Sequence, residues 1–157
     1  MKLKEAFLLI ATITTVVSWA HNAGPKDPTT AANPLAGTWK LVTGTLIEKG
    51  DTTVTDYSKD VSFIKIINDS HFSFIQHDLS KGKDSPVVFS AGAGTYNLND
   101  SLYTEHLEYC SAREWEGHDF TFKVKIENDT LVQSGIEKID SLGVDRMNIE
   151  KYVRVKK

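Results

Sequence analysis

From residue 37 onward, apolar and polar residues alternate in short runs and do not recur every three or four positions. Alternation with a period of two is typical of β-strands that bury one face, whereas an amphipathic helix has a period of about 3.6. The alternation predicts nine strands, at about residues 37–47, 52–57, 61–67, 71–79, 86–98, 101–110, 119–127, 130–138 and 147–155. One short helical turn is expected at 111–116, where Ser111 can cap it and Gly117 can end it. We therefore expect an all-β fold.

Three similar turn signals separate neighbouring strands: Asn68-Asp69-Ser70, Asn99-Asp100-Ser101 and Asn128-Asp129-Thr130. Asn and Asp tolerate the positive φ angles of tight two-residue hairpin turns, so the strands should follow one another as an up-and-down meander. An open sheet of eight or nine strands would leave two exposed edges, and closure removes them. The predicted architecture is a single antiparallel β-barrel, with a sandwich as the alternative.

A two-residue turn at Asn99-Asp100 would pair Leu98 with Ser101 and Tyr96 with Tyr103. Because side chains alternate between faces, one face would then carry Gly92, Gly94, Tyr96, Leu98, Tyr103, Glu105, Leu107 and Tyr109. Glycine has no side chain to fill a core. Gly92 and Gly94, with Gly135 from a later strand, therefore predict that the barrel encloses a cavity.

The other two hairpins give further inward faces. Across Asn128-Asp129, the predicted inward residues are Phe120, Phe122, Val124, Ile126, Leu131, Gln133, Gly135 and Glu137. Across Asn68-Asp69, the face chosen as inward carries Phe63, Ile67, Phe72, Phe74 and Gln76. A polar group among aromatic side chains must be paired, protonated or hydrogen-bonded, and such groups often orient a ligand. The alternatives are a register shifted by one residue, or structural pairing of the carboxylates with Arg113 or Arg146.

The candidate ligand-binding residues combine these polar groups with aromatic side chains on the same faces. Tyrosine offers both apolar area and a hydroxyl group. Trp115, in the helical turn, could lie at the mouth of the barrel or cover its closed end. The candidate set is Phe74, Gln76, Tyr96, Tyr103, Glu105, Tyr109, Trp115, Gln133 and Glu137.

Composition narrows the range of functions. With 157 residues, of which 40% are hydrophobic, the chain can bury one sizeable core. Its 18 basic and 21 acidic residues nearly balance, and basic residues cluster only at Arg154-Val155-Lys156-Lys157, which argues against a nucleic-acid partner. Cys110 is the only cysteine, so an intramolecular disulfide and a four-thiolate metal site are excluded.

The first twenty residues have the pattern of a signal peptide. Two early lysines precede a short apolar run at 6–17, and Ser18-Trp19-Ala20 supplies the small residues that a signal peptidase reads. We expect cleavage after Ala20, a flexible linker at 21–34, and a barrel domain at 35–157. The mature protein is then expected to be secreted or periplasmic, without a membrane anchor, and the alternative is an uncleaved anchor.

Metal binding and catalysis have less support. His71 and His77 share a face but lie roughly 20 Å apart along one strand, and His106 with Glu108 should face solvent. Cys110 and His106 would be about 13 Å apart, too far for a nucleophile and base. We expect no metal and no cofactor, and the best catalytic alternative is a hydrolase or isomerase that uses Glu105 and Glu137.

A family resemblance adds to this interpretation. Gly37-Thr38-Trp39, at the start of the first strand, resembles the Gly-x-Trp signature of lipocalins, in which the tryptophan plugs the closed end and a late arginine lies over it. Arg154 would be that arginine. Residues 35–157 resemble small secreted lipocalin-like (calycin-type) proteins of Gram-negative bacteria, without the disulfides and long C-terminal helix of typical lipocalins. The resemblance implies a barrel that binds a small apolar or amphipathic ligand; a solid barrel that binds a partner is the other alternative.

Overall fold

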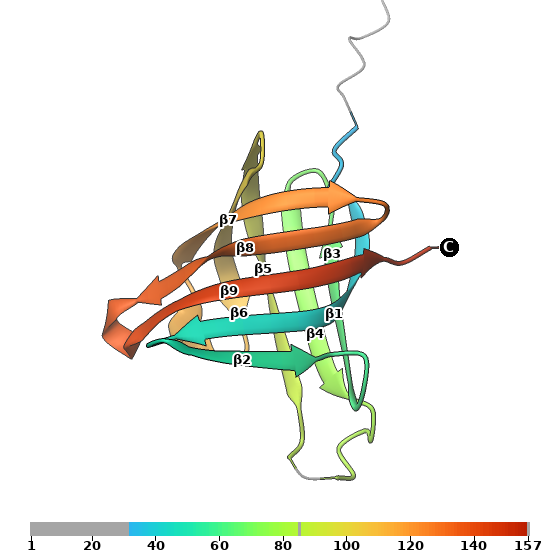
Figure 1. The fold of residues 1–157 in the computed structure, drawn as a ribbon, viewed down its shortest axis with the longest axis vertical. Helices are drawn as coiled ribbons and strands as arrows, with labels where there is room; N and C mark the ends of the chain where they lie inside the picture. The colour runs from blue at the N-terminus through green and yellow to red at the C-terminus, as the bar shows by residue number, and fades with distance from the viewer. Residues whose placement is uncertain (1–31, 85, 157) are drawn as a thin grey trace, which may run out of the picture. The chain divides into compact units, whose positions relative to one another are not determined.

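The computed structural model describes residues 32–84 and 86–156, so the predicted signal peptide and most of the predicted linker lie outside it. The described chain contains nine strands and two short 3-10 turns (Figure 1). In chain order these are β1 (Gly37–Glu48), β2 (Asp51–Asp56), β3 (Val61–Ile67), β4 (His71–Asp78), β5 (Phe89–Asn99), β6 (Leu102–Cys110), η1 (Arg113–Trp115), β7 (His118–Glu127), β8 (Thr130–Ile139), η2 (Asp140–Leu142) and β9 (Val144–Arg154). In these residues no helix has the length and apolar character that a membrane crossing requires.

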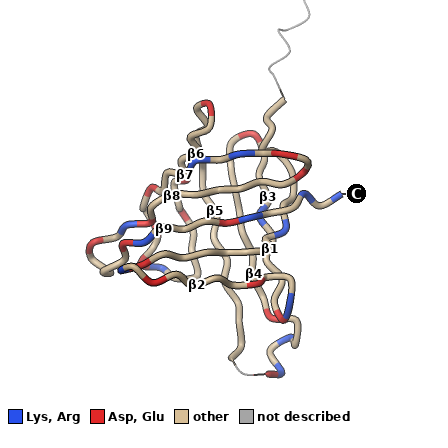
Figure 2. Tube along the Cα trace, viewed as in Figure 1, with Lys and Arg blue, Asp and Glu red and all other residues tan. Residues whose placement is uncertain are grey.

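The strands form one antiparallel sheet in the order β2-β1-β3-β4-β5-β6-β7-β8-β9, and an additional pairing between β1 and β9, which lie side by side in Figure 2, closes it. Eight strands therefore make a closed barrel. β2 is an extra strand that pairs with the second half of β1. Closure gives the backbone groups of β1 and β9 partners that a flat sheet would leave unpaired. The predicted all-β barrel is confirmed.

β1 changes partner along its length. Gly37–Lys40 pairs with β3, whereas the segment from Thr43 to Glu48 pairs with β2. β9 runs along the other side of β1, and the register between them shifts between Leu41 and Thr43. Just after β2, the backbone N–H of Tyr57 donates to the carbonyl of Val42 (3.0 Å). Beyond this point the β1–β2 hairpin diverges from β3.

The β7–β8 hairpin has the predicted turn, whereas the β5–β6 hairpin turns one residue later than predicted. At Asn128-Asp129 the two-residue turn is confirmed, with Glu127 opposite Thr130. In the β5–β6 hairpin, Leu98 lies opposite Tyr103, so the turn residues are Asp100 and Ser101, not Asn99 and Asp100. The pairing differs from the prediction by two positions. Because side chains alternate with a period of two, Tyr103 and Glu105 still point inward.

The inward orientation predicted for Tyr109 is wrong. Between Ala93 and Gly94 the register with β6 shifts, because Gly94 pairs with Leu107 while Ala93 pairs with Tyr109. This is a β-bulge, in which one extra residue exchanges the faces that follow it. Tyr109 is therefore 66% exposed on the outer surface. Cys110 lies on the inner face instead and lines the cavity.

The glycines also differ from expectation, because they leave no empty volume. A methyl group on Gly94 would collide with the backbone oxygen of His106, and one on Gly92 would collide with the ring of Phe74. A methyl group on Gly135 would meet the backbone oxygen of Thr121. These glycines permit close packing of the barrel wall, which is the other ordinary role of glycine in a strand.

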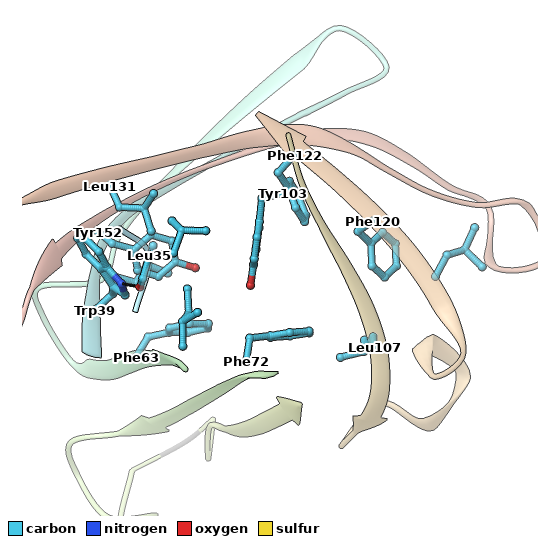
Figure 3. Close-up of a cluster of buried hydrophobic side chains, with 13 residues drawn as sticks. Leu35, Trp39, Phe63, Phe72, Tyr103, Leu107, Phe120, Phe122, Leu131 and Tyr152 are labelled. Atoms are coloured by element: carbon cyan, nitrogen blue, oxygen red, sulfur yellow. Dashed lines mark hydrogen bonds between the residues drawn. The ribbon is translucent and has the colours of Figure 1, made fainter. Parts of the chain in front are cut away.

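The hydrophobic core runs along the barrel axis (Figure 3). Trp39, Leu131 and Tyr152 gather at one end of the barrel, here called the closed end. The β3–β4 and β7–β8 turns lie at this end, beside the start of β1 and the end of β9. Phe120 and Leu107 lie toward the opposite end. Burial of large aromatic side chains supplies most of the driving force for such a fold, at about 25 cal/mol per Å² of apolar surface.

Candidate functional site: the barrel cavity

A cavity of about 320 Å³ lies inside the barrel. One part of its wall is apolar and another part is polar. The apolar part is mainly aromatic, and the polar part comes chiefly from β8 and β9 with one residue each from β3 and β6. The lining includes Tyr57, Phe63, Phe74, Leu107, Trp115, Phe120, Phe122 and Tyr152, and the polar residues Lys65, Glu105, Gln133, Glu137, Arg146, Asn148 and Glu150.

Lys65, in the middle of β3, is the centre of the polar part. Its side chain is only 2% exposed. The ammonium group forms an ion pair with Glu105 and donates to Oε1 of Gln133 (3.0 Å). It also lies 5.3 Å from the ring centroid of Tyr103 and 5.8 Å from that of Tyr152. A buried ammonium group needs such partners, because an isolated one is too costly to remove from water.

A second ion pair lies near the open end. Nε of Arg146 donates to Oε2 of Glu137 (2.7 Å), and Nδ2 of Asn148 donates to Oε1 of the same carboxylate (2.7 Å). The guanidinium group of Arg146 stacks over Trp115, with its central carbon 5.2 Å from the ring centroid. Trp115 also packs against Phe120, at a centroid distance of 5.7 Å. These contacts hold Trp115 at the mouth of the cavity and not over the closed end.

Glu150 is the third carboxylate of the cavity. Oε2 of Glu150 accepts a hydrogen bond from the hydroxyl of Tyr152 (2.8 Å). Burial raises the pKa of Glu150, and the positive charge of Lys65 opposes that rise. Burial also raises the pKa of Tyr152 and of Tyr103, and the negative charges of Glu150 and Glu105, respectively, add to the effect. Both phenols therefore stay neutral hydrogen-bonding groups across the physiological pH range.

The structure brings five of the nine predicted ligand-binding residues to the cavity wall: Phe74, Glu105, Trp115, Gln133 and Glu137. Gln76 is not part of the lining but lies next to it, where it accepts a hydrogen bond from Oγ of Ser90, a lining residue (3.2 Å). Tyr96 lies near the closed end, where its hydroxyl donates to the carbonyl of Asn68 (2.6 Å). The ring of Tyr103 packs against Tyr96 in the core below the cavity, at a centroid distance of 5.0 Å.

Sequence reasoning missed three polar residues of the site: Lys65, Asn148 and Glu150. It considered Arg146 only as a partner for a carboxylate, which is part of what Arg146 does. The alternation of Lys65 with Phe63 and Ile67 on the predicted inward face of β3 does mark it as an inward residue. Asn148, Glu150 and Tyr152 likewise alternate along β9. A charged residue in such a series is easily assigned to solvent, since charged residues are rarely buried.

The helical turn expected at 111–116 is a shorter 3-10 turn, η1, and its cap differs from the prediction. Ala112, not Ser111, occupies the N-cap position, without a side-chain hydrogen bond. Ser111 Oγ instead accepts a hydrogen bond from the backbone N–H of Ala91 (3.2 Å). Over residues 32–84 and 86–156, no three His, Cys, Asp or Glu side chains gather in a way that could hold a metal ion.

The Gly-x-Trp segment and Arg154 meet at the closed end, as expected. Trp39 is fully buried, and the guanidinium carbon of Arg154 lies 3.9 Å from its ring centroid. Nη1 and Nη2 of Arg154 donate to the carbonyls of Ala36 and Pro34, at 2.8 Å each. Gly37 has a φ of 142°, a backbone conformation that favours glycine, and a side chain there would also displace the guanidinium group.

Comparison with known proteins adds a family. No curated protein matches the sequence. Among solved structures, an uncharacterized protein from Bacteroides eggerthii is similar at 13% identity and a TM-score of 0.46, over 76% of this chain and 98% of that chain. A point mutant of the fluorescent protein UnaG is similar at 12% identity and a TM-score of 0.39, over 78% and 97%. The family described as a domain of unknown function, DUF4488, matches residues 34–157. Because this match spans the entire barrel, the chain belongs to the DUF4488 family.

Proposed function

We propose that this protein binds one small, partly apolar or amphipathic ligand inside its barrel. The observation that carries the proposal is the cavity of about 320 Å³, with aromatic side chains on one part of its wall and convergent polar groups on another. Ligand sites in proteins are typically concave, mostly apolar and from roughly 300 to 1,000 Å³ in volume, so this cavity suits a compact ligand. Its polar groups would orient the ligand, and its rings would supply the apolar contact.

The two alternatives have less support. In a solid barrel that binds a partner, the interior would be filled, which the cavity argues against. In a hydrolase, Glu105 and Glu137 would act as acid and base. Here Glu105 is held by Lys65, and Glu137 is held by Arg146 and Asn148. Carboxylates committed to buried ion pairs suit a structural or orienting role better than proton transfer.

The test uses a neutral fluorescent dye, N-phenylnaphthylamine, whose emission rises in apolar surroundings. The wild-type protein should bind one dye per chain. Ser90 lines the cavity, so Ser90→Phe should fill part of it and weaken dye binding strongly. The matched control is Thr121→Phe, because Thr121 is exposed on the outer face of β7. The proposal would be contradicted if both variants bound the dye with equal affinity, or if the wild-type protein did not bind it.

We also propose that the chain is exported, on the strength of the signal-peptide pattern at residues 1–20. The support is the positive start, the short apolar run and the small residues before the expected cleavage site. Mass spectrometry of the protein purified from its own host should find His21 as the first residue. An intact Met1 to Ala20 segment in membrane fractions would contradict the proposal.

A further inference from the structure

The charges around the cavity do not balance. The charged residues that line it are two cations, Lys65 and Arg146, and three carboxylates, Glu105, Glu137 and Glu150. Each cation already has its own carboxylate, since Lys65 pairs with Glu105 and Arg146 pairs with Glu137. Glu150 is therefore the carboxylate without a cation of its own among the cavity residues.

Glu150 is also accessible from the cavity. Only its Oε2 atom accepts a hydrogen bond within the described residues, from the hydroxyl of Tyr152. Across the β1–β9 ladder it lies opposite Gly44, which has no side chain to cover it. The ring of Tyr57 lies over Gly44, where a methyl group would come within 2.9 Å of Tyr57 Cε2. Gly44, Tyr57 and Glu150 all line the cavity, so a carboxylate and a ring stand together at its wall.

We propose that the ligand carries an amine, bound as an ammonium group against Glu150 beside the ring of Tyr57. This inference rests on the proposed ligand-binding function and names the chemical class of its ligand. An ammonium group would supply the missing cation through a charge-assisted hydrogen bond to Oε1 of Glu150. The ring of Tyr57 offers a favourable surface to the same cation. A carboxylate ligand would find both cations already engaged and would meet an unpaired negative charge.

Binding of the ammonium group should be coupled to a proton. Burial raises the pKa of Glu150 in the free protein, so at any given pH it holds a proton more often than an exposed glutamate does, and a bound ammonium group must displace that proton into the buffer. The charged and titratable groups that face Glu150 are Lys65 on β3, Glu105 on β6 and Glu137 on β8, together with the phenols of Tyr57, Tyr103 and Tyr152. Gln133 lies opposite it on β8. Affinity for an amine should therefore rise with pH through the pKa of Glu150, while affinity for an uncharged ligand of the same shape should not.

The experiment compares three probes that share a naphthalene ring system and differ in the polar group attached to it: naphthylmethylamine, naphthylmethanol and naphthoic acid. Isothermal titration of the full chain at neutral pH should give the amine about tenfold higher affinity than the alcohol, the size expected of one charge-assisted hydrogen bond, and should give naphthoic acid the lowest affinity. Titration of the amine in two buffers of different ionisation enthalpy, repeated at successively lower pH, should reveal proton release that grows as the pH falls. Glu150→Gln should remove the amine preference and the proton release, while keeping the alcohol affinity.

The control variant is Glu127→Gln, which removes an exposed carboxylate on β7 that pairs with Lys125 outside the cavity. It should keep the wild-type ranking. Equal affinity for amine and alcohol, or tightest binding of naphthoic acid, would overturn the amine assignment and leave the proposed function standing. If Glu150→Gln does not fold, the wild-type ranking and proton release decide the question. If neither the probes nor N-phenylnaphthylamine bind, the proposed function itself fails.

Discussion

Lys65 and Glu105 form an ion pair in which both side chains are buried. Removal of one partner leaves the other charged group without compensation in the interior, which typically costs about 3 to 5 kcal/mol. Lys65→Met should therefore lower the free energy of unfolding in urea by about that amount. The double variant Lys65→Met with Glu105→Gln should recover most of the loss, because neither member of this pair is then left as a charge without its partner. A double variant no more stable than the single one would contradict this account.

Arg154 stabilises the closed end without contacting the cavity. It lies over Trp39 and donates to two backbone carbonyls. Loss of the cation–π contact alone costs about 0.5 to 2 kcal/mol, so Arg154→Ala should lower the midpoint of urea unfolding. Under conditions where the variant is fully folded, its affinity for N-phenylnaphthylamine should equal that of the wild type. Arg154→Lys should recover little, since an ammonium group lacks the planar guanidinium that stacks on the indole while donating to both carbonyls. A large loss of dye affinity in Arg154→Ala would show that the two ends are coupled.

At the scale of the hairpins, the sequence predicted faces better than it predicted pairing. Alternation assigned Phe63, Phe72 and Phe122 to the interior, because a strand with one buried face must follow a period of two. The turn in the β5–β6 hairpin was placed one residue early, yet the faces were kept. The bulge near Tyr109 could not be anticipated, because it depends on the close approach of Gly94 to the backbone of His106 on the neighbouring strand. No local pattern in either strand encodes that approach.

The connection that follows β4 is held by Asp78. Oδ1 of this carboxylate accepts hydrogen bonds from the backbone N–H of Gly82 (2.7 Å) and the hydroxyl of Ser80 (2.6 Å), and Oδ2 accepts one from the N–H of Val88 (3.1 Å). The bond from Gly82 is the largest of the causes that lower the pKa of Asp78 to about 2.

This lowered pKa predicts how the connection responds to acid. A carboxylate with a depressed folded-state pKa stabilises the fold fully above its ordinary value of 3.8, and the contribution is lost as the pH falls toward about 2. Asp78→Ala should therefore be less stable than wild type in urea at neutral pH, and the difference should shrink as the pH falls through that window. The matched control is Asp84→Ala, an exposed carboxylate nearby. A stability difference that does not change with pH would contradict the role assigned to the Asp78 carboxylate.

At the scale of the whole molecule, closure of the barrel could be predicted because exposed sheet edges are unfavourable whatever their sequence. The cavity was also predicted, but from Gly92, Gly94 and Gly135, which the structure shows to be tightly packed. The space lies instead among the charged residues of β3, β6, β8 and β9. Their positions follow from cross-strand register around the closed barrel, and register is a long-range property that one strand does not encode. Lys65 was within reach of the alternation rule, whereas its proximity to Gln133 was not.

If the cavity binds a ligand, the stability of the whole barrel should depend on the ligand concentration. Any molecule that binds the folded state and not the unfolded chain stabilises it by RT ln(1 + [L]/Kd), or about 2.7 kcal/mol at a free concentration one hundred times Kd. Naphthylmethylamine at that excess should therefore raise the melting temperature in a single cooperative transition.

Two variants and two spectroscopic signals test this expected shift in melting temperature. Ser90→Phe, with the cavity partly filled, should show little of the shift, and Thr121→Phe should show all of it. The barrel is one cooperative unit, so the shift should be the same whether it is followed by far-ultraviolet circular dichroism or by tryptophan emission, to which both Trp39 and Trp115 contribute. A shift seen by tryptophan emission alone would mean that the ligand changes the surroundings of an indole, such as Trp115 at the cavity mouth, without stabilising the fold, and would contradict the predicted stabilisation.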